Sequence, residues 1–193
     1  MFILASKSPR RIELLKSVGL NFRIETAQVD EAKILYENKH QPHQQQVLAI
    51  AQAKAKAVFE RHQGREKVLA GDTLVVVDDE ILGKPVDEAD AKRMLVALTG
   101  KSHHVYTAIS LIDADQETSF VSTSKVTFRD YNQDVEAIID ASIANKSALG
   151  KAGAYGIQET GSLLVTHIEG DYYAIMGLPL AKTYQLLVEK GWI

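Results

Sequence analysis

Asp72 is the residue of this sequence whose type and setting point most directly to chemistry. It follows the apolar run of residues 68–71 and precedes Thr73, so a carboxylate and a hydroxyl interrupt a segment typical of a buried strand. Burying a carboxylate without a partner is very costly. In one interpretation Asp72 pairs with Lys84, which a turn at residues 78–79 brings back along the chain, and the pair is structural. In the other, Asp72 is a metal ligand or general base and Lys84 contacts a phosphate.

Two arginines stand at the start of a predicted helix. Ser8 and Pro9 are typical of an N-cap and a first helical position, and Gly19 is typical of a helix end. Arg10 and Arg11 then occupy the first turn, where the helix dipole favours acidic residues. A bound anion, most commonly phosphate, would remove this conflict. The alternative is a capped surface helix with two solvated arginines.

A lysine shares a helix face with apolar residues. Val47, Ala51, Lys54 and Val58 recur at helical spacing in a helix predicted from about Gln45 to His62. Such a lysine either extends its ammonium to the edge of the apolar face or points into a cleft as a fixed positive charge for a ligand.

A glycine-rich segment runs from residue 150 to residue 158. Its glycines allow a ligand to approach the backbone closely, although their order differs from that of a Walker A loop. Gln158 could offer a donor and an acceptor to the edge of a nucleobase. The alternative is an irregular turn without a ligand.

The composition limits the classes of protein that fit. A chain of 193 residues can form a buried core, and we expect a single domain over residues 1–193. The absence of cysteine excludes a disulfide scaffold, a thiolate zinc site and a cysteine nucleophile. A net charge of -3 without a basic block argues against nucleic acid as a partner. No apolar run approaches the roughly 20 residues of a membrane span, so we expect a cytoplasmic protein with no membrane partner.

Helical and strand patterns both occur along the chain. His103 and His104 precede a strand and would point to opposite sides of it, so they are not expected to share a metal. Residues 36–46 are polar and predict an exposed connection. In the last helix we expect Leu180, Tyr184, Leu187 and Val188 to face the core.

Five motifs, taken in order, resemble those of the Maf family of nucleotide pyrophosphatases and extend over nearly the whole chain. They are residues 5–11 (ASKSPRR), 71–73 (GDT), 83–85 (GKP), 151–158 (KAGAYGIQ) and 177–180 (GLPL). The resemblance implies an α/β fold: an elongated mixed β-sheet flanked by helices, with two lobes around a central cleft, as in Maf-like and ITPase-like proteins. It also implies hydrolysis of nucleoside triphosphates to monophosphate and pyrophosphate, a housecleaning of the nucleotide pool. The form of the fourth motif is similar to the dTTP/UTP pyrophosphatase branch.

The resemblance also implies roles for individual residues. Asp72 matches the proton acceptor, and Arg10, Thr73 and Gln158 match positions tied to substrate preference. A divalent cation, Mg²⁺ or Mn²⁺, would be held by Glu31 or Asp72. A nucleoside triphosphate is the implied small-molecule partner, and a homodimer is the implied assembly. The remaining substrate-binding positions of the cleft are matched by Ser8, Arg11, Lys54 and Lys84.

The sequence departs from the family pattern at several places. Gly71 stands where alanine is usual, and Glu159 follows Gln158 where glycine is usual. The customary aspartate before Lys151 is absent, and residues 172–174 replace an expected asparagine. These departures leave the phosphate and acid groups intact and bear on base preference, because two of them lie beside Gln158. Two alternatives stay open. The chain could act on another base, such as that of 7-methyl-GTP, or it could be a nucleotide-binding regulator of cell division with little hydrolysis.

Overall fold

The computed structural model describes all 193 residues, and it is a mixed α/β structure. The strands are β1 (Phe2–Leu4), β2 (Phe22–Ile24), β3 (Val68–Val77), β4 (Glu80–Leu82), β5 (Ser102–Ile112), β6 (Glu117–Phe128) and β7 (Val165–Glu169). The α-helices are α1 (Pro9–Ser17), α2 (Glu31–Glu37), α3 (His43–Arg61), α4 (Glu88–Leu98), α5 (Gln133–Ala144), α6 (Tyr172–Met176) and α7 (Leu180–Glu189). Two 3₁₀ helices cover Ala152–Ala154 and Thr160–Leu164. The expected α/β class is confirmed.

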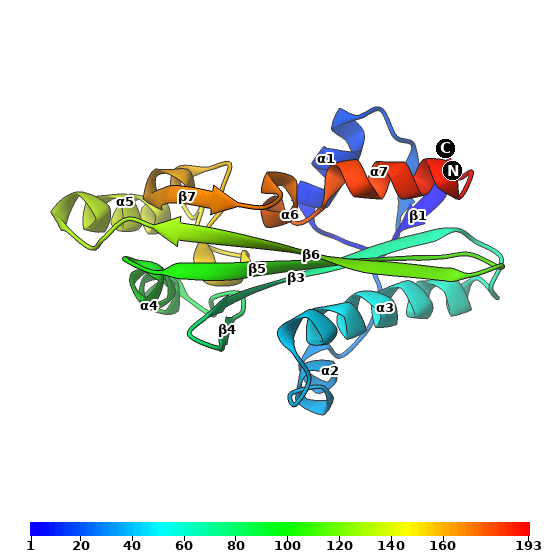
Figure 1. The fold of residues 1–193 in the computed structure, drawn as a ribbon, viewed down its shortest axis with the longest axis horizontal. Helices are drawn as coiled ribbons and strands as arrows, with labels where there is room; N and C mark the ends of the chain where they lie inside the picture. Colours follow the sequence, from blue (N-terminus) through cyan, green and yellow to red (C-terminus); the bar gives the residue numbers. More distant parts are fainter. The chain divides into compact units, whose positions relative to one another are not determined.

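The seven strands form one sheet in the order β2-β1-β3-β5-β6-β7, with β4 paired to β3 (Figure 1). The strand β1 is parallel to both β2 and β3, whereas β4 and β7 pair antiparallel with β3 and β6. The chain divides into two compact units. Unit 1 comprises Met1–Thr73, Thr107–Ser122 and Gly177–Ile193, and unit 2 comprises Leu74–Tyr106 and Thr123–Met176.

In unit 1, helices cover both faces of β1 and β3. Figure 1 shows α1 and α7 on one side of these strands and α3 on the other. The helix α3 packs Ala55 and Val58 against Ile3 and Val68 of the strands. Its other buried side chains follow the predicted helical spacing, with Gln46, Val47, Ile50 and Ala51 also buried. This packing holds α3 firmly along β3.

In unit 2, the core joins strand residues to α4 and α5. Val75 and Val105 from the strands pack in one cluster with Leu95 of α4 and Ile139 of α5. The predicted turn at residues 78–79 is present, with both aspartates at positive φ (48° and 67°), as a tight hairpin between β3 and β4 requires.

Three details differ from or refine the sequence-based expectations. The polar segment 36–46 is not simply a connection, because α2 ends within it and α3 begins within it. In α7, Tyr184 and Val188 are exposed by 43% and 51%, so their predicted place in the core was wrong. Thr183 takes the buried position because it lies one turn from Leu180 and Leu187 on the same face. No helix has both the length and the apolar character needed to cross a membrane.

Candidate active site

The predicted polar residues of unit 1 gather where β1 ends beside a strand that continues. Directly after β1, the Ala5 N–H donates to the Leu69 carbonyl of β3 at 2.7 Å. Beyond this point β3 continues for several residues, while the segment that follows β1 turns away through Ser6 to Ser8 and enters α1. The start of α1 is therefore held beside Asp72 and Thr73.

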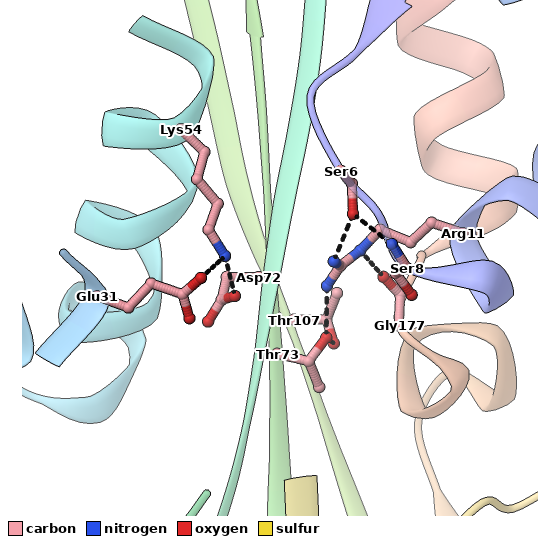
Figure 2. Close-up of polar contacts among 9 residues, drawn as sticks. All are labelled: Ser6, Ser8, Arg11, Glu31, Lys54, Asp72, Thr73, Thr107 and Gly177. Carbon is pink, nitrogen blue, oxygen red and sulfur yellow. Dashed lines mark hydrogen bonds and ion pairs between the residues drawn. The ribbon is translucent and has the colours of Figure 1, made fainter. Parts of the chain in front are cut away.

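Asp72 points to the face of β3 that α3 covers (Figure 2). The ammonium of Lys54 lies 2.7 Å from Asp72 Oδ1 and 2.8 Å from Glu31 Oε1. Lys54 and Asp72 are nearly buried, with side chains 12% and 13% exposed, whereas Glu31 is 51% exposed. Lys54 thus pairs with two carboxylates at once, and the buried carboxylate obtains its partner from α3. The sequence had offered Lys84 as that partner.

Thr73 points to the opposite face of the same strand, toward α1 (Figure 2). There the Arg11 guanidinium donates through Nη2 to Thr73 Oγ1 at 3.0 Å, through Nη1 to Ser6 Oγ at 3.2 Å and through Nε to the Gly177 carbonyl at 2.7 Å. The Thr73 hydroxyl also shares a hydrogen bond with Thr107 Oγ1 at 2.9 Å. Arg11 is buried, and its three hydrogen bonds connect the start of the chain to β3 and to the segment before α7.

The charges of this cluster influence one another. Burial lowers the pKa of Arg11, and the neighbouring positive charge of Arg10 lowers it further, whereas Asp72 and Glu31 raise it. An arginine keeps its charge despite such shifts. The same interactions show that Arg10, Glu31 and Asp72 all lie within electrostatic reach of Arg11.

Ser8 and Arg10 occupy the predicted start of α1. Ser8 is the N-cap residue and Pro9 is the first helical residue, as expected. The Ser8 side chain makes no capping bond, and its backbone N–H donates instead to Ser6 Oγ at 3.2 Å. Arg10 is half-buried. The first turn of α1 therefore has neither an acidic residue to balance the positive end of the helix dipole nor a side chain that caps its free N–H groups.

The remaining two predicted residues belong to unit 2. Lys84 is exposed and lies just after β4, where Pro85 follows it. Gln158 is exposed and follows the 3₁₀ turn at residues 152–154. Two predicted residues, Lys84 and Gln158, therefore belong to unit 2. The others belong to unit 1: Ser8, Arg10, Arg11, Glu31, Lys54, Asp72 and Thr73.

The protein by itself supplies only some of the ligands that a divalent cation needs. No cluster of three or more His, Cys, Asp or Glu side chains could form a complete metal site. Glu31 and Asp72 nevertheless converge on a single cation, Lys54 Nζ, within 2.8 Å. A pair of carboxylates is what Mg²⁺ commonly takes from a protein when substrate phosphates and waters supply the other ligands. The donor set therefore fits such an ion.

Several residues of this site were missed by the sequence interpretation. Ser6 and Gly177 both lie in motifs that the sequence analysis singled out. Gly177 accepts through its backbone carbonyl, and a backbone contact cannot be inferred from the type of residue. Thr107 lies in an ordinary alternating strand and offered no signal. Gly71 also has a clear role, because a Cβ there would lie 2.8 Å from Ile109 Cδ1 and 3.2 Å from Arg11 Nε.

The fold and this cluster define an α/β protein in which a buried carboxylate, an exposed carboxylate and basic side chains lie beside one strand, an arrangement suited to an anionic substrate. The family described as Maf-like protein matches residues 1–190, and the chain belongs to that family.

Three similar proteins from Bacillus species share one name with each other. The chain is 44% identical over 181 residues to a dTTP/UTP pyrophosphatase of Bacillus cytotoxicus, covering 94% of this chain and 91% of the relative. It is 43% identical over 180 residues to one of Bacillus mycoides, covering 93% and 90%. A Bacillus cereus protein of the same name is 44% identical over 180 residues, covering 93% and 85%.

Proposed function

We propose that this protein is a nucleoside triphosphate pyrophosphatase that hydrolyses dTTP and UTP to the monophosphate and pyrophosphate. The observation that carries the proposal is the position of Asp72, which Lys54 holds beside Glu31 within electrostatic reach of Arg11 in the first turn of α1. Relatives named for this activity, 43–44% identical over more than nine-tenths of the chain, support it.

In the proposed reaction Asp72 is the general base. Lys54 bonds Oδ1 of Asp72, which leaves Oδ2 to accept a proton from water. The water oxygen forms a bond to the α-phosphorus in line with the bridging oxygen, and the bond from that phosphorus to the bridging oxygen breaks. Pyrophosphate leaves with the electron pair, and the proton remains on Asp72 until solvent removes it.

The basic residues are proposed to bind the triphosphate. Arg10 and the backbone N–H groups at the start of α1 supply positive charge to a phosphate. Ser8 contributes at the same turn. Arg11 and Thr73 belong to the network on the other face of β3, and Arg11 uses three of its five N–H donors for protein acceptors, which leaves two for a phosphate. For Lys84 and Gln158, a phosphate contact and a base contact stay predictions.

A divalent cation, Mg²⁺ or Mn²⁺, is proposed to be held by Glu31 and Asp72. When bound, it would offset the negative charge of the phosphate oxygens. Lys54, which already bonds both carboxylates, would then orient them toward the ion.

A pyrophosphate-release assay with a panel of triphosphates tests the proposal. We expect turnover of dTTP and UTP well above that of dCTP, dATP, GTP and 7-methyl-GTP, and loss of turnover in EDTA that Mg²⁺ or Mn²⁺ restores. Preferred turnover of 7-methyl-GTP would reassign the substrate. Nucleotide binding without turnover of any triphosphate would favour a regulator. A cytoplasmic location and a homodimer are further proposals, and sedimentation equilibrium tests the second.

A further inference from the structure

The segment that carries Gln158 is fixed to the rest of unit 2 at several points. The Gly153 N–H donates to the Gly83 carbonyl at 3.1 Å, and the buried Tyr155 hydroxyl bonds His103 Nε2 at 2.8 Å. Tyr155, Gly156 and Ile157 are all buried. Gln158, the next residue, is exposed. A rigid, buried segment therefore presents one amide side chain to solvent.

Lys151 and Glu159 close this segment at its two ends. Lys151 Nζ lies 2.8 Å from Glu159 Oε2 and also donates to the Ser147 carbonyl at 2.7 Å. The Lys151 side chain is only 11% exposed, and that of Glu159 is 36% exposed. A lysine buried to this extent needs a carboxylate partner, because its charge is poorly solvated. The pair is therefore a fixed connection and not a loose surface contact.

The backbone between the two residues is shaped to admit this ion pair. A Cβ on Gly156 would lie 3.0 Å from Lys151 Cε and 3.2 Å from Glu159 Cδ. The pair thus packs directly over Gly156, two residues before Gln158. Any side chain there would push the lysine and the glutamate apart.

The Glu159 carboxylate also contacts Gln158. Gln158 Nε2 donates to Glu159 Oε1 at 3.5 Å, while the other oxygen of the carboxylate bonds Lys151. This contact is at the long limit for an N–H···O hydrogen bond, so its direction matters more than its strength. With one N–H of the NH₂ group directed to Glu159, the amide is oriented so that its carbonyl oxygen can accept from a ligand.

We propose that Lys151 and Glu159 are positioning residues for base selection: the ion pair holds the Glu159 carboxylate against Gln158, so that Gln158 presents its carbonyl oxygen to the base. This proposal rests on the proposed function and on the predicted base contact of Gln158. Thymine and uracil carry a ring N3–H donor that a carbonyl oxygen accepts. The corresponding N3 of cytosine is an acceptor and would face that oxygen unfavourably.

Steady-state kinetics with dTTP and dCTP tests the proposal. In Glu159→Gln and in Lys151→Met, we expect the ratio of kcat/KM for dTTP to that for dCTP to fall about tenfold, the effect of one hydrogen bond. The loss should appear in the KM for dTTP, with kcat changed less than about twofold, because Asp72 is untouched. The double variant should lose no more than either single variant, since both act through one ion pair.

Two further variants separate positioning from stability. Glu159→Asp keeps the charge and should retain most of the discrimination, whereas Glu136→Gln, which removes an exposed carboxylate of the same unit, should leave it unchanged. An unchanged dTTP to dCTP ratio in Glu159→Gln and Lys151→Met, together with a lower Tm, overturns the proposal and makes the pair structural. If Glu159→Gln does not fold, Lys151→Met decides alone, and an unchanged dTTP to dCTP ratio in that variant overturns the proposal. A wild-type protein that hydrolyses neither dTTP nor UTP contradicts the proposed function instead.

Discussion

Asp72 and Thr73 are consecutive residues of β3, yet their side chains join separate polar networks on opposite faces of the strand (Figure 2). Asp72 bonds Lys54 of α3, and Thr73 accepts from Arg11 of α1. The alternation of side chains along a strand produces this division. The carboxylate of Asp72 and the hydroxyl of Thr73 therefore have different hydrogen-bond partners, although the charge of Asp72 still acts on Arg11.

Asp72→Asn is expected to lower hydrolysis of dTTP about 10²-fold or more, because an amide cannot accept the proton from water. Nucleotide binding should persist, since the side chain keeps its shape. Steady-state kinetics and calorimetric titration with dTTP measure the two properties. Asp78→Asn, at an exposed turn position with positive φ, is the matched control and should behave as wild type. Full activity of Asp72→Asn would remove Asp72 from the mechanism.

Lys54→Met is expected to lower the free energy of unfolding by about 3 kcal/mol, because it leaves a nearly buried carboxylate without its cation. Part of that loss reflects repulsion between Asp72 and Glu31. Adding Glu31→Gln should therefore recover some of the stability. Urea denaturation of the single and double variants measures both effects. An additive double variant would show that the two carboxylates do not interact.

Arg11→Lys is expected to lower the free energy of unfolding by about 2 kcal/mol, because a lysine cannot serve the acceptors on Ser6, Thr73 and Gly177 together. Arg10→Ala should instead raise the KM for the triphosphate with little change in Tm. Thermal unfolding and kinetics on both variants distinguish the two arginines. Equal effects of both substitutions on KM would place Arg11 in direct contact with substrate.

Gly71→Ala is expected to destabilise the fold by about 1–3 kcal/mol, because the new methyl group would lie 2.8 Å from Ile109 Cδ1 and 3.0 Å from the Ala108 carbonyl oxygen. Ile109→Val removes the nearer of these atoms. The double variant should therefore be more stable than Gly71→Ala alone, as urea denaturation would measure. If Ile109→Val gives no recovery, the backbone contact limits the site.

His103 makes stability depend on pH. Burial lowers the pKa of His103 from 6.5 to about 3, with a further contribution from the charge of His104. Below pH 6.5 the unfolded chain binds a proton that the folded chain does not, so stability falls with decreasing pH between about 6.5 and 3. The slope from this residue is at most about 1.4 kcal/mol per pH unit. Urea denaturation between pH 7 and pH 4 should show a shallower slope in His103→Gln than in wild type. An exposed histidine elsewhere in the chain provides the control, since His40→Gln should keep the wild-type slope.

The sequence predicted the local structure of this protein well. A Ser-Pro pair followed by an apolar face defined α1, and two aspartates between apolar runs defined the β3 to β4 hairpin. Such features depend on the backbone preferences of neighbouring residues. The last helix shows where this reasoning fails: Tyr184 is apolar at a plausible spacing, but whether it is buried depends on what packs beside it.

The order of motifs along the chain was enough to indicate the family, and residue types alone marked Asp72, Lys54 and Arg11 as worth attention. Their partners were decided only by the tertiary structure. Lys54 meets Asp72 because α3 packs along β3, and Arg11 meets Gly177 across 166 positions of the chain. A sequence records which side chains are present and how they alternate. The distance between residues far apart in the chain is set by the packing of whole helices on the sheet, and no local pattern contains it.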